Sequence, residues 1–253
     1  MMNVILLAAG FSKRFGSNKL LHCIDGTPMY RYAVEAAKEY QEGSPSQHQK
    51  PGNGEAVRLI AVTAYEEIGR ELCSRDGFVP YGEPSECIAL AENIAPAEYL
   101  EPAESMKTDG TMKPDESMKP DRRVVFNRNR EMGISHSIEL GIRAAGAMAD
   151  EDSLMFMVCD QPRLAAGELF RLAEEFRQSK KTIACLSDGE RTGNPAVFSG
   201  IYREELLSLC GDTGGKAVIK RHSEEVYLCP ASNPAALEDI DYIDNDIDRE
   251  EDE

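Results

Sequence analysis

The sequence predicts an α/β fold, a Rossmann-like three-layer sandwich in which helices cover both faces of a mostly parallel sheet. Short apolar segments alternate along the chain with segments of helical periodicity, which is the order that builds a parallel sheet. Several of the apolar segments are uniformly hydrophobic, as strands buried on both faces are. With 253 residues, 42% of them hydrophobic, the chain can form this core, and we expect residues 1–253 to make one domain.

The first half of the chain predicts buried strands at residues 3–9 and 57–64, with a helix between them. Thr27 and Pro28 should open this helix, because Thr is a favoured N-cap and Pro is favoured at the first helical position. Alanine and tyrosine residues continue the helix at helical spacing as far as Tyr40.

The second half predicts an amphipathic helix over residues 134–145, marked by Ile134, Ile138 and Ile142, and a buried strand at residues 153–159. The remaining segments continue the alternation and comprise residues 124–126, 164–178, 182–186, 196–198, 206–209, 217–221 and 226–229.

Two polar inserts, at about 41–55 and 97–121, interrupt this pattern, and an acidic tail follows it. Residues 97–121 are rich in proline and charge, a composition that favours a disordered insertion. Of the net charge of −17, −9 lies in residues 238–253 and −4 in residues 97–121, which leaves only −4 elsewhere. Nothing resembles a basic surface, so we expect no nucleic acid partner.

The sequence also argues against a membrane protein and a disulfide framework. No apolar run approaches the roughly 20 residues that a membrane helix needs. The seven cysteines are scattered and form no CxxC pair, which predicts a protein of the reducing cytoplasm without a structural zinc site.

The strongest functional signal is residues 7–10 (LAAG) together with the following loop, which contains Arg14 and Lys19. In open α/β sheets, ligands bind at the carboxyl ends of the strands. The small residues leave room for a base or a phosphate beside the main chain, whose N–H groups can bind phosphate oxygens. The alternative is an ordinary turn with two surface cations. The loop is not a Walker A motif, because the GxxxxGK pattern does not occur.

Asp160 follows the strand predicted at residues 153–159. A carboxylate there could bind Mg²⁺, which typically takes one or two carboxylates together with substrate phosphates. Alternatively, Asp160 only begins a turn before Pro162. Ser135 and Ser137, at the start of the predicted helix, could cap that helix or hold an anionic group.

Several blocks of the chain, in order, resemble the MobA/MocA-like nucleotidyltransferases, the enzymes that attach CMP or GMP to molybdopterin. Residues 7–19 (LAAGFSKRFGSNK) are similar to the LAAGxSxRxGxxK signature of this family, and residues 159–162 (CDQP) to its DQP segment. The later blocks are Asn127 with residues 133–137 (GISHS), residues 193–196 (GNPA), residues 211–214 (GDTG) and residues 246–248 (DID). LAAG, CDQP and GNPAVF are most similar to the cytidylyltransferase branch, MocA. The residues after DID, Arg249 and Glu250, depart from the usual Thr-Pro, and the insert at 97–121 is foreign to the pattern.

The resemblance implies that CMP passes from CTP to the phosphate of molybdopterin cofactor, with Mg²⁺ as the cofactor and pyrophosphate as the leaving group. The product would then serve an apo molybdenum hydroxylase. The expected catalytic residues are Arg14, Lys19 and Asp160, and the expected metal ligands are Asp160 and Asp248. The expected nucleotide-binding residues are Leu7, Ala8, Ala9, Gly10, Arg14, Lys19, Asn127, Gly133, Ser135 and Ser137.

Two alternatives remain at this point. The enzyme could transfer GMP instead, or use another phosphorylated acceptor such as a sugar phosphate. The chain could also be a non-catalytic accessory protein that binds the cofactor and delivers it. A carrier has no need for a metal carboxylate, so release of pyrophosphate from CTP would separate the two classes.

Overall fold

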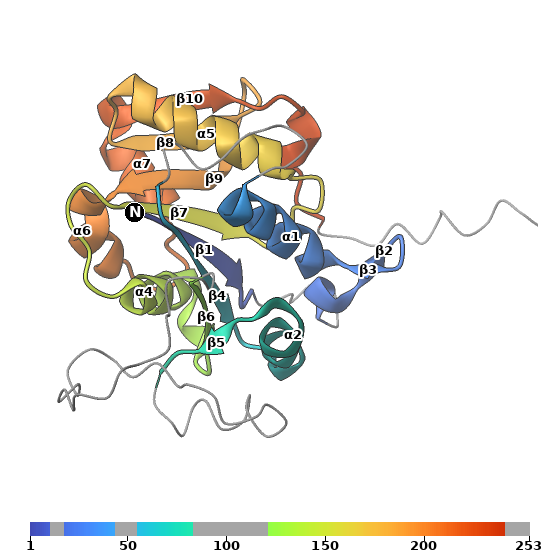
Figure 1. Cartoon of the computed structure of the whole chain (residues 1–253). Coiled ribbons are helices and arrows are strands. Elements are labelled where there is room, and N and C mark those ends of the chain that lie inside the picture. The colour runs from blue at the N-terminus through green and yellow to red at the C-terminus, as the bar shows by residue number, and fades with distance from the viewer. Residues whose placement is uncertain (11–17, 44–54, 83–120, 241–253) are drawn as a thin grey trace, which may run out of the picture.

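The computed structural model describes residues 1–10, 18–43, 55–82 and 121–240. The predicted α/β sandwich is confirmed. An eight-stranded sheet with the order β10-β8-β9-β7-β1-β4-β6-β5 lies between two layers of helices (Figure 1). Within this sheet β9 is antiparallel to its neighbours β7 and β8, and the other pairings between the strands described are parallel.

The strands of this sheet are β1 (Met2–Ala8), β4 (Val57–Thr63), β5 (Val79–Pro80), β6 (Arg122–Phe126), β7 (Ser153–Val158), β8 (Ile183–Ser187), β9 (Thr192–Ser199) and β10 (Val226–Pro230). A hairpin is formed by β2 (Cys23–Ile24) and β3 (Thr27–Pro28). The helices are α1 (Met29–Glu42), α2 (Glu66–Asp76), α4 (Ile134–Ala145), α5 (Ala166–Ser179), α6 (Arg203–Leu207) and α7 (Lys216–Arg221).

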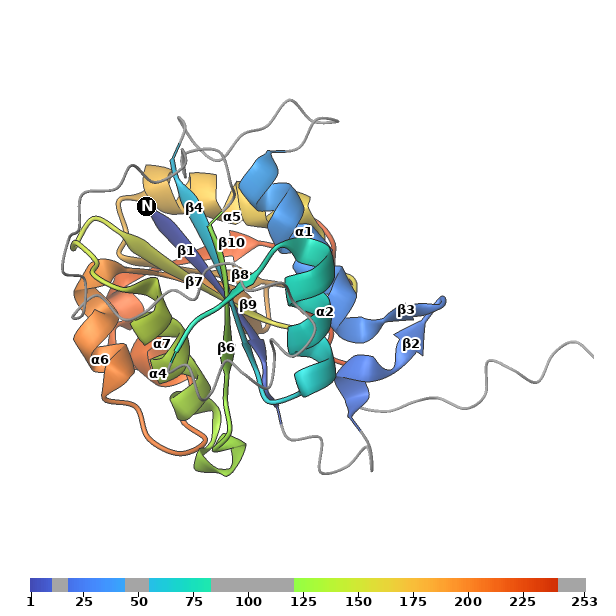
Figure 2. The ribbon, with the colours of Figure 1, turned by 60° about the horizontal axis from the view of Figure 1, so that its bottom comes forward.

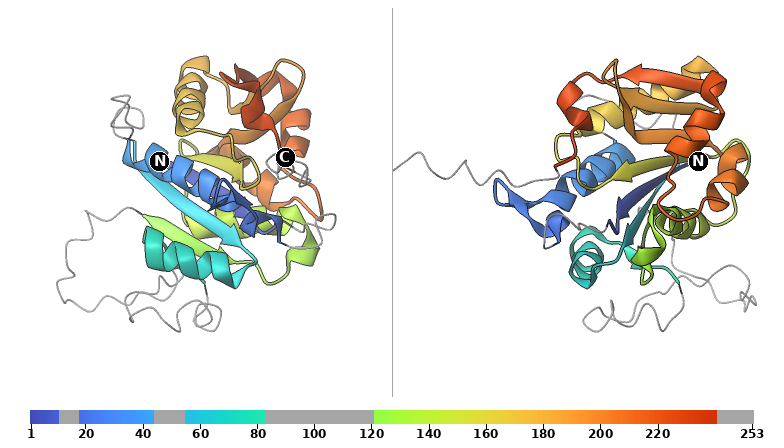
Figure 3. Two further views of the ribbon diagram at one scale, coloured as in Figure 1. Left: turned by 90° about the vertical axis from the view of Figure 1, so that its right-hand side faces the viewer. Right: turned by 180° about the vertical axis from the view of Figure 1, so that it is seen from behind.

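Strand β1 contributes to two hydrophobic cores, one on each face of the sheet. Val4 and Leu6 belong to the core formed with α1, α2 and α5, whereas Ile5 belongs to the core formed with α4, α6 and α7. Successive side chains of a strand point to opposite faces, so a uniformly apolar strand can fill both cores. Figure 3 shows the two helical layers from the side and from behind.

The start of the first helix differs from the prediction. Asp25 and Gly26 have positive φ angles of 50° and 75° and form the two-residue turn of the β2–β3 hairpin. Thr27 is therefore a strand residue and not the N-cap. Pro28 takes the N-cap position instead, and α1 begins at Met29. The hairpin projects away from the sheet beside α1 (Figures 1 and 2).

The first insert is shorter in the structure than the range we expected, because α1 continues to Glu42 and ends at Gly43 (φ 84°). Asp121, which we expected in the second insert, is bound to the sheet: its carbonyl accepts a hydrogen bond from Leu59 N–H (3.0 Å). Residues 44–54, 83–120 and 241–253, which hold the rest of the inserts and most of the acidic tail, lie outside the described residues.

The prediction omitted α2 and β5, whereas the later elements were predicted to within a few residues. For example, the helix expected at 164–178 is α5 (Ala166–Ser179). No helix in the part of the chain that the structure describes is long and apolar enough to cross a membrane.

Candidate active site

The carboxyl ends of neighbouring parallel strands bring several of the predicted site residues that the structure describes to one edge of the sheet. Leu7 of β1 is in register with Val62 of β4 and with Val158 of β7. The segments that follow these strands therefore begin side by side, where ligands bind in open α/β sheets. They carry Gly10 after β1 and Asp160 after β7.

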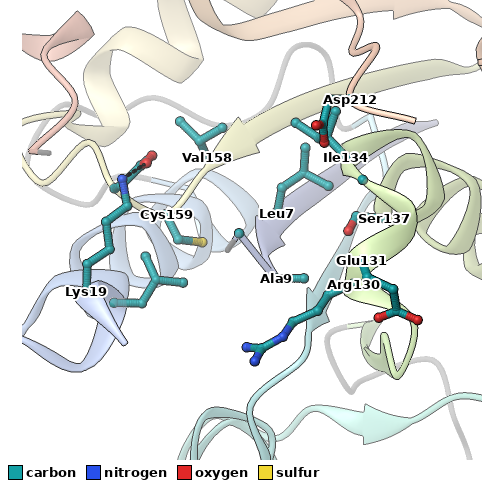
Figure 4. A pocket seen from close by; sticks show the side chains of 14 residues that line it. Leu7, Ala9, Lys19, Arg130, Glu131, Ile134, Ser137, Val158, Cys159 and Asp212 are labelled. Carbon is teal, nitrogen blue, oxygen red and sulfur yellow. Dashed lines mark ion pairs between the residues drawn. The ribbon is translucent and has the colours of Figure 1, made fainter. Parts of the chain in front are cut away.

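A cavity of ≈ 460 Å³, called here the first cavity, opens at this edge between the end of β1, the start of α4 and the segment after β7 (Figure 4). Pockets for small molecules have this size. Most of the predicted site residues that the structure describes line the first cavity: Leu7, Ala9, Gly10, Lys19, Gly133, Ser137 and Asp160. Arg14 and Asp248 lie outside the described residues.

Lys19 and Asp160 form an ion pair on one side of the first cavity, with 2.6 Å between Lys19 Nζ and Asp160 Oδ2. Lys19 begins a short 3₁₀ turn (Lys19–Leu21), whose N-cap Asn18 accepts a hydrogen bond from Leu20 N–H (3.1 Å). The Lys19 and Asp160 side chains are 13% and 21% exposed, so a ligand in the cavity can reach them. Two residues that were predicted to be catalytic thus contact each other.

One oxygen of the Asp160 carboxylate has no hydrogen-bond partner in the described part of the chain. Its Oδ1 is buried and has no hydrogen-bond partner among the residues described. A buried carboxylate oxygen without a partner is costly, and it suits an oxygen-preferring cation such as Mg²⁺. The described ranges contain no group of three or more His, Cys, Asp or Glu side chains that could hold a metal. Such a cation would therefore need further ligands from phosphates, from water or from other parts of the chain.

The acidic C-terminal segment begins beside Asp160. Ile240 N–H donates to the Asp160 carbonyl (3.1 Å), and Gln161 Nε2 donates to Asp239 Oδ1 (2.9 Å). Both contacts hold the segment that leads to residue 241 against the carboxyl end of β7.

Asn127 and Ser135 lie behind the wall of the first cavity. Asn127 is 1% exposed, and its Nδ2 donates to Ser137 Oγ (2.9 Å), which orients a side chain that lines the cavity. Ser135 N–H donates to the Gly211 carbonyl (3.1 Å), so this N–H of the first turn of α4 is already bonded. No side chain caps α4, whose N-cap is Gly133, so neither serine has the capping role considered from the sequence.

Gly133 allows the loop around Gly211 to pack against the start of α4. Its φ is 87°, and a Cβ at this position would lie 2.4 Å from both the carbonyl carbon and the oxygen of Gly211. Only glycine fits such a close approach of two backbones. The contact holds Asp212 at the first cavity, which that residue lines.

Sequence reasoning missed Arg130, Glu131 and Asp212, all of which line the first cavity. The Arg130 guanidinium lies 5.5 Å from the centre of the Tyr65 ring, whose hydroxyl donates to the Gly10 carbonyl (2.9 Å). Arg130 lies inside the sequence block that begins at Asn127, and this position was the signal that could have identified it.

Cys159 also lines the first cavity, but it is not an activated nucleophile. Burial, reinforced by the charge of Asp160, raises the pKa of its thiol far above the ordinary value. The thiol therefore stays neutral at physiological pH, and the thiolate that attacks as a nucleophile does not form.

The sequence matches the model of one protein family, the MobA-like NTP transferase domain, over residues 4–70 and 108–226. No curated protein sequence matches the chain.

The fold is similar to those of several solved structures. One is a nucleotidyl transferase from Methanothermobacter thermautotrophicus (19% identity, 96% of this chain and 92% of that chain covered, TM-score 0.59). Another is 4-diphosphocytidyl-2C-methyl-D-erythritol synthase from Anaerococcus prevotii (12% identity, 96% and 93% covered, TM-score 0.53). A third is the Rv0371c protein of Mycobacterium tuberculosis H37Rv in complex with manganese (17% identity, 91% and 88% covered, TM-score 0.52).

Proposed function

The chain belongs to the MobA-like NTP transferase family, and from this premise we propose that it transfers CMP from CTP to the phosphate of molybdopterin cofactor and releases pyrophosphate. One observation carries the proposal. In a cavity at the carboxyl end of β1, a lysine pairs with a carboxylate whose other oxygen is buried and has no hydrogen-bond partner among the described residues. The product passes to an apo molybdenum hydroxylase.

In this reaction a phosphate oxygen of the acceptor attacks the α-phosphorus of CTP. A new P–O bond forms as the bond to pyrophosphate breaks, so the protein need not supply a nucleophile. Catalysis then depends on positioning and on neutralising the phosphate charge. The neutral Cys159 thiol is consistent with this chemistry.

Each of the four charged residues predicted from the sequence has a role in this proposal. Lys19 and Arg14 bind the triphosphate and stabilise the charge that develops on the leaving pyrophosphate. Asp160 and Asp248 would hold Mg²⁺, which when bound would supply further neutralisation of the phosphate charge. Ser137, oriented by Asn127, offers a hydroxyl to the nucleotide.

The residues after β1 favour a pyrimidine base. Ala9 lines the first cavity and is 5% exposed, so its methyl group takes space that a glycine would leave free. A smaller cavity beside the strand end accommodates cytosine better than guanine, because a well-packed site has little room for extra atoms.

The test is an NTP panel with molybdopterin as the acceptor, in which pyrophosphate and the product nucleotide are both measured. We expect a higher kcat/KM for CTP than for GTP, and Ala9→Gly should reduce this preference. A preference for GTP would assign the chain to guanylyl transfer. Cofactor binding without release of pyrophosphate would make it an accessory protein.

A further inference from the structure

The residues that follow β10 cross the edge of the sheet at which the first cavity opens, and we call this segment, residues 231–240, the strap. It begins at the end of β8, where Ala231 N–H donates to the Ser187 carbonyl (2.7 Å). It ends at Ile240, whose N–H donates to the Asp160 carbonyl after β7 (3.1 Å). In Figure 1 the strap runs from the end of β10 toward the end of β7.

The strap is anchored in the fold apart from its contacts near Asp160. A short 3₁₀ helix (Pro234–Leu237) buries Ala236 and Leu237 in the core formed with α1, α2 and α5. Leu237 packs over Gly193 of β9, where a Cβ would lie 2.9 Å from Leu237 Cδ2. Glu168 of α5 accepts hydrogen bonds from two backbone N–H groups at the start of the strap (2.8 and 3.3 Å). The strap can therefore support the residues that it contacts.

The sheet itself does not reach Asp160. The pairing of β7 with β9 extends to Phe156, and its pairing with β1 extends to Val158. Asp160 lies two residues further on, in a turn, and the hydrogen bond to its carbonyl comes from Ile240 of the strap. A metal ligand has to be held within about 0.5 Å of its productive position, so the turn that carries Asp160 needs support from outside the sheet.

Gln161 makes a second link between this turn and the strap. Its side chain is 3% exposed and is not part of the lining of the first cavity. Its Nε2 donates to Asp239 Oδ1 (2.9 Å) and to the Leu237 carbonyl (3.5 Å), and both of these atoms are acceptors, so the amide nitrogen faces the strap. Its Oε1 has no partner among the described residues. The hydrogen bonds that the structure describes for this side chain thus all go to the strap.

We propose that Gln161 and Asp239 are positioning residues, whose hydrogen bond fixes the turn after β7 so that the Asp160 carboxylate is held in place for a divalent cation. The inference rests on the proposed function, in which Asp160 would hold Mg²⁺, and deepens it. The family match ends at residue 226, so Asp239 lies beyond it. Hydrogen-bond partners outside the ligands themselves orient metal ligands and tune metal affinity.

Two substitutions at Asp239 separate a hydrogen-bonding role from a role of its charge. Asp239 is exposed, so Asp239→Ala leaves no buried cavity. It removes the acceptor for Gln161 Nε2. Asp239→Asn removes the negative charge but keeps an oxygen that can accept this hydrogen bond. A positioning residue should therefore tolerate asparagine and not alanine, whereas a residue that attracts or binds the cation through its charge should tolerate neither.

The experiment uses the full chain and measures metal binding at equilibrium, without turnover. The probe is Mn²⁺, which takes the same oxygen ligands as Mg²⁺ and whose binding is followed by water proton relaxation. Separate titrations contain the α,β-methylene analogue of CTP or of GTP, neither of which can release pyrophosphate, so the result does not depend on the choice of base.

We expect Asp239→Ala to weaken Mn²⁺ binding by roughly tenfold, the lower end of the effect of such outer partners, and Asp239→Asn to bind Mn²⁺ as the wild type does. Glu238→Ala is the matched control, because the Glu238 carboxylate pairs with Arg163 on the surface, and it should leave Mn²⁺ affinity unchanged. Asp160→Asn should lose most of the Mn²⁺ binding.

Gln161→Leu tests the link from its other side, since it keeps much of the side-chain volume and removes the donor. It should weaken Mn²⁺ binding as Asp239→Ala does, and the double variant should be no weaker than Gln161→Leu alone, because both substitutions break one interaction. Additive losses would overturn the inference. So would Mn²⁺ affinity that stays at the wild-type value in Asp239→Ala, equal losses in Asp239→Ala and Asp239→Asn, or Mn²⁺ binding that does not depend on Asp160.

The outcomes also separate this inference from the proposed function. If Asp239→Ala weakens Mn²⁺ binding and Asp239→Asn does not, but CMP is not transferred to molybdopterin, the proposed function is wrong and the role of the strap stands. If transfer occurs and the Mg²⁺ concentration for half-maximal rate is the same in the wild type and Asp239→Ala, the reaction is right and the strap does not position the metal carboxylate.

Discussion

Two buried or partly buried ion pairs in this molecule differ in how completely their carboxylates are satisfied. Arg31 and Asp76, between α1 and α2, have side chains that are 2% and 0% exposed. Both oxygens of Asp76 are bonded, since Arg31 donates to each of them and Lys38 Nζ donates to Oδ1 (2.8 Å). In the pair of Lys19 with Asp160, by contrast, Asp160 Oδ1 has no hydrogen-bond partner among the described residues.

We interpret this difference as that between a pair that stabilises the fold and a pair that serves the proposed site. A network in which every carboxylate oxygen is bonded stabilises the fold while its members are present, because removing one weakens the compensation of a buried charge. A pair at the edge of a cavity in which one carboxylate oxygen has no partner contributes less to stability. That oxygen can then bind a ligand. We therefore expect substitutions at Asp76 to change stability, and substitutions at Lys19 or Asp160 to change activity.

The largest expected effect is the loss of stability in Asp76→Asn. The substitution removes one carboxylate partner of buried Arg31, which keeps its pairs with Glu35 and Glu71, and should lower the free energy of unfolding by about 3 kcal/mol, measured by urea unfolding. Glu66→Gln is the control, because the Arg70–Glu66 pair is 48% and 49% exposed and should contribute under about 1 kcal/mol. A loss for Asp76→Asn as small as that of the control would remove the distinction between the two pairs.

The stabilisation by Asp76 should also depend on pH. Burial alone would raise the pKa of Asp76, but hydrogen bonds from Arg31 and Lys38 outweigh it and hold the pKa below its ordinary value of 3.8. The contribution is therefore complete above pH 3.8 and disappears as the pH falls through the lower pKa of the folded state. Unfolding curves of the wild type and Asp76→Asn should accordingly converge in strong acid.

Lys19→Ala should lower turnover by roughly 10² or more, because it removes a preorganised charge from the proposed phosphate site. Its melting temperature should barely change. Lys38→Ala is the matched control: it removes a lysine from the complete network and should lower stability without changing kcat. Wild-type turnover in Lys19→Ala would exclude this residue from the mechanism.

Asp248→Asn tests the second metal carboxylate and should raise the Mg²⁺ concentration for half-maximal rate several-fold, since Mg²⁺ in such sites is held by one or two carboxylates. Asp244→Asn, in the same acidic segment, should leave it unchanged. The Mg²⁺ dependence of Asp212→Asn is compared as well, because the Asp212 carboxylate lines the first cavity and the neighbouring cavity of ≈ 280 Å³. Equal Mg²⁺ dependence in the wild type and all three variants would leave Asp160 as the one protein ligand with support.

The smallest effect is expected for deletion of residues 103–120, which lie in the second predicted insert. Long surface loops cost little to shorten, so activity and melting temperature should stay close to those of the full chain. Unfolding of the shortened protein would show that the segment is part of the fold. Loss of cofactor transfer alone would make it a docking segment.

The fold could be predicted because buried parallel strands are uniformly apolar, as residues 3–9 and 153–159 are. Helix α2 was missed because its buried face contains Ile68 and Leu72 together with the carboxylate of Asp76, a pattern too polar to show a clear apolar stripe. Thr27 was misassigned because its capping preference competed with the Asp25–Gly26 turn before it, and the turn determined the structure.

Site residues could be predicted only where a single segment of the sequence carries a recognisable motif. Lys19 and Asp160 each stand in a local motif, but their contact spans most of the chain and has no local signature. A neighbouring cavity of ≈ 280 Å³ is lined by residues of β1, β7, β9, α4, α7 and the loop at Asp212. No single segment among these predicts it. Such a surface depends on how strands and helices pack, which periodicity alone does not specify.

The ion pair between Lys19 and Asp160 also relates the binding of a divalent cation to the binding of a triphosphate. A divalent cation that approaches Asp160 meets an ammonium group already 2.6 Å from one of its oxygens, and the two positive charges compete for the carboxylate. A triphosphate gives Lys19 another anionic partner and so frees Asp160. Metal and nucleotide should therefore bind cooperatively, and thermodynamic linkage requires each to raise the affinity of the other by the same factor. Without a nucleotide, the affinity of Asp160 for a divalent cation should therefore be lower than in its presence.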